Sequence, residues 1–261
     1  MSRLDSFLFE KGLFSSRNKA AEAIKRGEVL VNGKTENKPS KEVSGDEKVE
    51  VNCENSFVSL GGYKLDRAIS AFSLDVSGLT FADVGASTGG FTHCLIKRSA
   101  KKVYAVDVGE NLLHPLIRSD KRVIAIENFN ARHLTEQTLG EKVDGVVVDC
   151  SFISLKIILP PIKSVIKDDG FIIALVKPQF ECGDKKKLGK SGILRDEKEI
   201  VKIIVDLIEY SAGLGLAVTN IVNAPVYKDK NKEFLIKLSF VGKKLTESDV
   251  KEAVRKAKEE I

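Results

Sequence analysis

The sequence predicts an α/β protein: a Rossmann-like sheet of mostly parallel strands, preceded by a small α+β unit. Three observations lead to this expectation. After about residue 55, short apolar runs typical of buried strands alternate with segments of helical periodicity. The turn GASTGG joins the first of these strands to a helix. Residues 1–54 instead hold two short helical patterns and an Asn-Gly turn that follows an apolar run.

Composition sets the protein class. A chain of 261 residues has room for one medium-sized domain and a small one. Its 43% hydrophobic and 30% charged residues are typical of a soluble globular protein, and its net charge of +5 permits an acidic partner without requiring one. We expect it in the cytoplasm, because no apolar run could span a bilayer and the first residues lack a signal-peptide core. The cysteines form no CxxC pair, which favours structural thiols over a disulfide framework or metal site: Cys53, Cys94, Cys150 and Cys182.

The first unit begins with two short helices. Apolar residues at helical spacing around positions 4–8 and 20–24 predict them, Val29–Lys34 reads as a strand entering an Asn-Gly turn, and Lys48–Val51 reads as a closing strand. Residues 1–26 contain six basic and three acidic side chains, whereas residues 27–50 are net acidic. The helical pair therefore carries the positive excess, which is typical of a phosphate-binding face but also of a plain solvated surface.

The same unit resembles a known RNA-binding domain. The strings RLD, GL before SR, a helix ending in I..G, V.VNG and KP occur in the order found in the small domain named after ribosomal protein S-four. The resemblance covers residues 1–54 and implies recognition of folded RNA by shape and backbone. It leaves 55–63 as a linker and 64–261 as a second domain. The implied RNA contacts are Arg3, Ser16, Arg17, Lys19 and Arg26.

The second unit alternates strands and helices. We expect strands at Thr80–Val84, Val103–Asp107, Val123–Glu127, Gly145–Asp149, Phe171–Val176, Ala217–Val222 and Phe234–Val241. Helices are expected at Lys64–Ala71, Thr88–Arg98, Asn111–Arg118, Leu155–Ile166, Glu197–Ala212 and Glu247–Glu260. No long helix separates the last two strands, so they are expected to pair antiparallel.

The glycine-rich turn predicts a nucleotide crevice. It frees backbone N–H groups at a helix start, and Asp107 at the end of the next strand is placed to accept hydrogen bonds from ribose hydroxyls. The spacing is not GxGxxG, so a dinucleotide is not expected. Asp83 before the glycines suits a ligand with a positive centre, such as S-adenosylmethionine. Packing glycines in an ordinary strand–turn–helix are the alternative.

Charged residues stand at predicted strand ends. Asp149 and Lys177 each close an apolar run, and Lys64 and Glu233 could join them at one edge. A lysine there could orient a ribose hydroxyl, stabilise its developing negative charge or accept its proton. Each residue taken singly is more typical of a structural ion pair. The lysine-rich loop Gln179–Gly192 is either a substrate lid or a solvated loop.

A second resemblance covers this unit. The strings GGYKL, DVGASTGGFT, VYAVDVG, VVVDCSFISL, LVKPQFE and NKEFL follow the order of the haemolysin-A-type (TlyA) ribosomal RNA 2′-O-methyltransferases, whose catalytic domain is FtsJ-like. The resemblance implies S-adenosylmethionine as cofactor and a ribose 2′-hydroxyl of cytidine as acceptor. Its catalytic tetrad falls on Lys64, Asp149, Lys177 and Glu233, with Lys177 nearest the acceptor and no metal. The implied cofactor contacts are Asp83, Gly85, Ser87, Gly89, Phe91 and Asp107.

Two departures from the family pattern concern target choice. Leu60 stands where an Arg is usual, and residues 227–233 replace a glycine-rich segment. Ribosomal RNA or ribosomal subunits are the expected partners, a membrane is not, and a monomer is slightly favoured. The alternatives are an RNA-binding protein with an inactive methyltransferase fold, a membrane-lytic haemolysin, and a nicotinamide-dependent oxidoreductase, which would need the missing GxGxxG.

Overall fold

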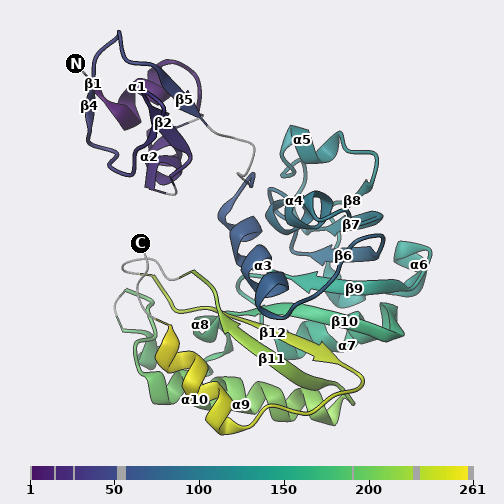
Figure 1. Cartoon of the computed structure of the whole chain (residues 1–261). Coiled ribbons are helices and arrows are strands. Elements are labelled where there is room, and N and C mark those ends of the chain that lie inside the picture. The colour runs from purple at the N-terminus through teal and green to yellow at the C-terminus, as the bar shows by residue number, and fades with distance from the viewer. Residues whose placement is uncertain are drawn as a thin grey trace. The chain divides into compact units, whose positions relative to one another are not determined.

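The computed structural model divides into two compact units, residues 1–56 and 57–261 (Figure 1). It describes residues 2–14, 16–25, 27–51, 57–189, 191–225 and 230–257. Along these ranges, no helix is both long and apolar enough to cross a membrane.

The first unit packs two helices against short strands. Val29–Val31 and Lys34–Thr35 pair antiparallel around Asn32 and Gly33, which both have positive φ, as a tight hairpin turn requires. Its core contains Leu4, Leu8 and Ile24 from the helices, so the two expected helical stripes are confirmed. Its elements are β1 Ser2–Arg3, α1 Leu4–Glu10, α2 Arg17–Lys25, β2 Val29–Val31, β3 Lys34–Thr35, β4 Glu42–Val43 and β5 Val49–Val51.

The second unit is built on a seven-stranded sheet in the order β11-β12-β10-β9-β6-β7-β8. The strands run parallel except β12, which pairs antiparallel with both β10 and β11. This confirms the mostly parallel Rossmann-like sheet with an antiparallel last strand. The strands are β6 Thr80–Val84, β7 Lys102–Val106, β8 Val123–Ile126, β9 Val143–Val148, β10 Ile166–Val176, β11 Ala217–Asn223 and β12 Phe234–Ser239.

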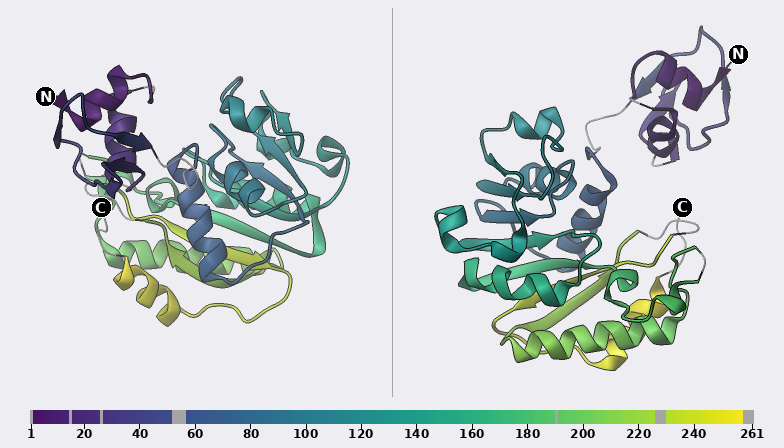
Figure 2. Two further views of the ribbon diagram at one scale, coloured as in Figure 1. Left: turned by 45° about the horizontal axis from the view of Figure 1, so that its top comes forward. Right: turned by 180° about the vertical axis from the view of Figure 1, so that it is seen from behind.

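Helices cover both faces of this sheet (Figures 1 and 2). Neighbouring residues of β6 show the alternation, because Phe81 belongs to the core beneath α3 and α4 whereas Ala82 belongs to the core beneath α7 and α9. Both faces of the central strands are therefore buried, which explains their nearly unbroken apolar runs. One face carries α3 Leu60–Ala71, α4 Gly90–Lys97 and α5 Pro115–Arg118; the other carries α6 Glu136–Leu139, α7 Leu155–Val165, α9 Glu197–Gly213 and α10 Glu247–Lys256.

Three helices begin at residues that differ from expectation, each for a local reason. α3 begins at Leu60, so the helix expected from residue 64 includes residues 60–63 of the predicted linker. α4 begins only at Gly90, because Gly89 adopts a left-handed conformation with φ of 87°. α5 begins at Pro115, where proline suits the first helical turn and the His114 ring accepts a hydrogen bond from the Leu116 N–H.

Candidate active site

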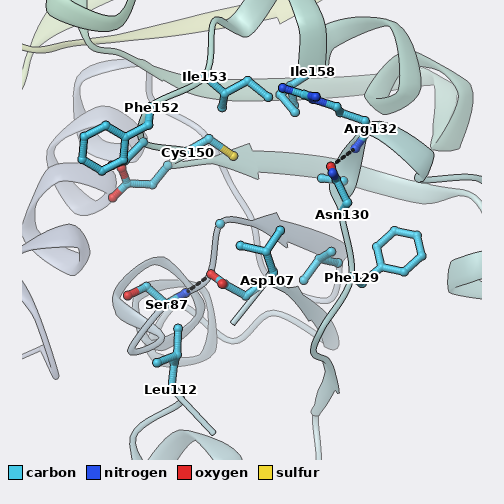
Figure 3. A pocket seen from close by; sticks show the side chains of 16 residues that line it. Ser87, Asp107, Leu112, Phe129, Asn130, Arg132, Cys150, Phe152, Ile153 and Ile158 are labelled. Carbon is cyan, nitrogen blue, oxygen red and sulfur yellow. Dashed lines mark hydrogen bonds between the residues drawn. The ribbon is translucent and has the colours of Figure 1, made fainter. Parts of the chain in front are cut away.

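A cavity of about 490 Å³ opens at the carboxyl ends of β6, β7, β8 and β9 (Figure 3). In an open α/β sheet, this edge is where ligands bind. Figure 3 shows Asp107 and Ser87 on one side of the cavity, with Cys150, Phe152 and Ile153 opposite. The cavity is large enough for a ligand the size of a nucleoside derivative.

Asp107 supplies a fixed carboxylate at the polar side of this cavity. Its Oδ2 accepts a hydrogen bond from the Ser87 N–H at 2.8 Å, and its Oδ1 accepts one from the Gly109 N–H at 2.8 Å. Because each carboxylate oxygen has a second lone pair, both can still accept from a ribose diol. Leu112 and Phe129 provide apolar lining for a base. The residues present therefore fit an adenosine-containing cofactor.

The six predicted cofactor residues divide into two groups. Gly85, Ser87 and Asp107 line the cavity. Gly89 and Phe91 lie behind it: Gly89 takes the left-handed conformation before α4, where an added Cβ would meet Ile117, and the Phe91 ring is buried in the core under α4. Neither residue is among those that line the cavity; Gly89 shapes the turn before α4, and Phe91 packs in the core at the start of that helix.

Asp83 is fully buried and does not line the cavity either. Its Oδ2 accepts hydrogen bonds from the Thr92 N–H at 2.8 Å and the Thr92 hydroxyl at 2.6 Å, whereas its Oδ1 has no hydrogen-bond partner among the described residues. Burial raises the pKa of this carboxyl to about 7, and the nearby Asp149 adds to the rise. Within the folded protein it holds the start of α4 against β6.

The glycines let backbone segments approach one another. An added Cβ at Gly85, which has φ of 84°, would lie 2.8 Å from the carbonyl oxygen of Asp149. One at Gly90 would lie 2.2 Å from the Ser59 hydroxyl oxygen, and one at Gly62 would lie 2.2 Å from the Phe57 ring. The start of α3 therefore packs directly on the start of α4. This close packing fixes the helix that carries Lys64.

The structure brings all four predicted catalytic residues to one edge of the sheet as two ion pairs. Lys177 Nζ lies 2.6 Å from Asp149 Oδ1, and Lys64 Nζ donates to Glu233 Oε2 at 2.5 Å. The β10–β12 register pairs Val176 with Phe234, so Lys177 and Glu233 directly follow and precede paired residues. Their side chains are 10 to 22% exposed, which leaves them partly desolvated but reachable. The separate strand ends thus form one charged cluster.

Two predicted RNA contacts meet in the first unit. Asp5 Oδ2 lies 2.8 Å from Arg3 Nη2 and 3.3 Å from Arg17 Nε. The Arg3 guanidinium, with Arg17 and the Ser6 N–H, lowers the pKa of the Asp5 carboxyl to about 2. Both arginine side chains remain about half exposed, at 47 and 52%. Ser16 lies just before α2; the side chain of Lys19 and the whole of Arg26 fall outside the described residues.

Sequence reasoning missed the loops that complete the cavity. Residues 129–132 follow β8 and residues 150–153 follow β9, and both segments contribute lining. The position of both segments directly after predicted strands was the signal that could have identified them as cavity lining. Burial raises the pKa of Cys150 to about 12, so this thiol stays protonated and is not a nucleophile. Within the described ranges, no cluster of three or more His, Cys, Asp or Glu side chains is placed to hold a metal ion.

Comparison with known proteins identifies the family. Residues 57–240 match the FtsJ-like methyltransferase family, and residues 2–49 match the S4 domain. The chain belongs to the FtsJ-like methyltransferases. It is therefore a methyltransferase with S-adenosylmethionine as its cofactor.

Relatives extend over nearly the whole chain. The 16S/23S rRNA (cytidine-2′-O)-methyltransferase TlyA of Mycobacterium tuberculosis is 40% identical over 82% of this chain and 80% of its own length. Hemolysin A of Brachyspira hyodysenteriae is 37% identical over 89% of this chain and 98% of its own. A solved structure from Streptococcus thermophilus, provisionally described as a hemolysin, is 33% identical, covers 97% of this chain and 94% of that one, and has a TM-score of 0.74.

Proposed function

We propose that this methyltransferase modifies the 2′-hydroxyl of a cytidine ribose in ribosomal RNA. The observation that carries this proposal is the cluster of two lysine–carboxylate pairs beside the nucleoside-sized cavity. Methylation of an unactivated hydroxyl needs that hydroxyl oriented and its proton removed, which a partly desolvated lysine beside a carboxylate can do. The TlyA relative, named for cytidine-2′-O methylation of rRNA, supplies the acceptor.

Each charged residue has a role in this proposal. Lys177 lies nearest the acceptor hydroxyl and either takes its proton or stabilises its developing charge. Asp149 holds Lys177 through their 2.6 Å contact, and Glu233 holds Lys64, which orients the ribose or its phosphate. Bound S-adenosylmethionine supplies an electrophilic methyl group on a sulfonium. Asp107 accepts hydrogen bonds from the ribose of that cofactor, and Ser87 lies beside it.

The rim of the cavity suits a nucleotide taken out of its stack. The Phe152 side chain is 89% exposed, and its ring lies 4.8 Å from that of Phe180, measured between centroids. An exposed aromatic face can stack on the base of the target nucleotide, whatever its sequence context. Such stacking would offset part of the cost of unstacking that base.

The first unit docks the RNA in this proposal. Residues 1–54 bind folded ribosomal RNA through Arg3, Ser16, Arg17, Lys19 and Arg26. Residues 55–63 are the linker, of which residues 60–63 already form the first turn of α3, and residues 64–261 perform the transfer. The paired guanidiniums of Arg3 and Arg17 support this, because arginine forks match phosphate oxygens. A monomer acting on ribosomal subunits in the cytoplasm is the simplest arrangement.

The decisive experiment compares ribose methylation of ribosomal RNA in cells with and without this chain, and with a Lys177→Ala variant. Lys167→Ala is the matched control, because Lys167 lies at the other end of β10 and pairs with Asp144 instead. We expect one or more cytidine 2′-O-methyl marks to require the wild-type chain, to persist with Lys167→Ala and to disappear with Lys177→Ala. Identical methylation in all strains would refute the proposal and favour an RNA-binding protein with an inactive methyltransferase fold.

A further inference from the structure

Lys177 contacts a second oxygen besides that of Asp149. Its Nζ donates a hydrogen bond to the Ser151 hydroxyl oxygen at 2.8 Å, and it lies 2.6 Å from Asp149 Oδ1. A protonated lysine has three N–H groups, whereas a neutral amine has two N–H groups and one lone pair. The two oxygen contacts leave one further position on the tetrahedral nitrogen, which holds the third N–H of an ammonium or the lone pair of an amine.

We propose that Ser151 is a positioning residue that, together with Asp149, holds the Lys177 Nζ in the orientation that faces the acceptor hydroxyl. This inference rests on the proposed ribose methylation. As the 2′-oxygen bonds to the methyl carbon, the carbon–sulfur bond breaks with its electron pair left on sulfur, and the hydroxyl proton moves to the Lys177 amine. The resulting ammonium keeps both contacts, so no rearrangement accompanies the transfer. Lys177 is then the base, and Ser151 acts through it.

The loop that carries Ser151 is held at several points. Phe152 has a φ of 63°, a left-handed conformation that is unfavourable for a bulky residue and persists only where the surroundings enforce it. Its ring contacts that of Phe180 in α8 (Pro178–Glu181), the helix that directly follows Lys177. These constraints keep an otherwise exposed Ser151 in place.

Glu181 anchors the far end of the same loop. Its carboxylate accepts hydrogen bonds from the Ser154 hydroxyl at 2.5 Å and from the Leu155 N–H at 2.7 Å, at the start of α7. A carboxylate at a helix N-terminus is favourable. The segments after β9 and β10 are thus joined at both ends, by Ser151 with Lys177 and by Ser154 with Glu181. A loop tied in this way can hold an amine in one orientation.

The test compares two replacements of Ser151 that have nearly the same shape, one with a hydroxyl and one without. Thr and Val are nearly isosteric, so Ser151→Thr keeps a hydroxyl where Ser151→Val places a methyl group. Single-turnover methyl transfer to ribosomal RNA is measured at saturating enzyme and cofactor. We expect Ser151→Thr to stay within about 5-fold of the wild type and Ser151→Val to be about 10- to 100-fold slower, as expected for losing a hydrogen bond to a charged group. Ser151→Ala should match Val, which shows that branching at this turn is not the cause.

Binding is measured separately because Ser151 also lines the cavity. Calorimetry with S-adenosylmethionine should give the same affinity for the wild type and all three variants, since the hydroxyl acts on the rate. Equal rates for Thr and Val, a wild-type rate for Ala, or a loss that appears in cofactor affinity instead would each overturn the inference. Absence of transfer by the wild-type chain would instead refute the proposed function, so the two failures are distinguishable.

Discussion

Replacing Asp83 by Asn should abolish a large pH dependence of stability. The buried carboxyl has a pKa of about 7 against an ordinary value of 3.8, so the folded chain keeps this proton at pH values where the unfolded chain has lost it. The free energy of unfolding therefore falls as pH rises from about 4 to about 7 and stays low above that range. A difference of about 3 pKa units corresponds to about 4 kcal/mol at 1.36 kcal/mol per unit, as an upper limit. Asn cannot titrate, so the variant should lack this slope.

Urea unfolding of the full chain, followed by circular dichroism at pH 5 and pH 8, measures the effect. Between pH 5 and pH 7, the free energy of unfolding of the wild type should fall by about 2–3 kcal/mol, whereas that of Asp83→Asn should change little. Asp75→Asn is the control, because Asp75 is an exposed carboxylate that accepts a hydrogen bond from the Ser77 N–H. Parallel pH profiles for the wild type and Asp83→Asn would show that the Asp83 carboxyl does not titrate as burial predicts.

Three further predictions concern binding and rate. Asp107→Ala should weaken S-adenosylmethionine binding by about 1.5–3 kcal/mol in calorimetry, because a charge-assisted pair of hydrogen bonds is lost; unchanged affinity would place the cofactor elsewhere. Lys177→Ala should slow single-turnover transfer by roughly 100- to 10,000-fold with unchanged cofactor affinity, and Lys177→Arg should not restore it, whereas a near-normal rate for either would leave Lys177 a structural partner. Asp5→Asn should weaken RNA binding several-fold in filter-binding assays although it raises the net charge, because Arg3 and Arg17 lose their shared partner; tighter binding would show that charge alone matters.

Most strand positions could be predicted from the sequence, because a strand that is buried on both faces gives a nearly continuous apolar run. Thr80–Val84 has the predicted bounds. β10 begins at Ile166, five residues before the predicted start at Phe171. The charged residues 167–169 belong to this strand but interrupt its apolar pattern, so the sequence does not reveal where it starts. The apolar pattern predicts Ile166 as the last residue of the preceding helix, which ends at Val165. Local periodicity cannot separate a helix from a strand that follows it without a turn.

The candidate site was only partly predictable. Residues 64, 149, 177 and 233 were expected at one edge, but their division into two ion pairs depends on the β10–β12 register and on where α3 begins. Asp83 is buried because both faces of β6 are covered, and its contacts with Thr92 form only when α4 packs on that strand. Ser151 escaped prediction because its relation to Lys177 arises from two loops that meet only in the folded chain.

The close packing at Gly62 and Gly90 means that the active site can be lost without altering any charged residue. A single methyl group at Gly90 would fall 2.2 Å from the Ser59 hydroxyl oxygen, 3.0 Å from the Gly62 backbone nitrogen and 3.2 Å from the Gly61 Cα. Because two of these atoms are backbone, the start of α3 would have to move away from α4. Lys64 is carried on α3, and its 2.5 Å contact with Glu233 would shift with that helix. Natural variants that inactivate the enzyme should therefore include glycine substitutions. A survey restricted to the four charged positions would score such alleles as intact.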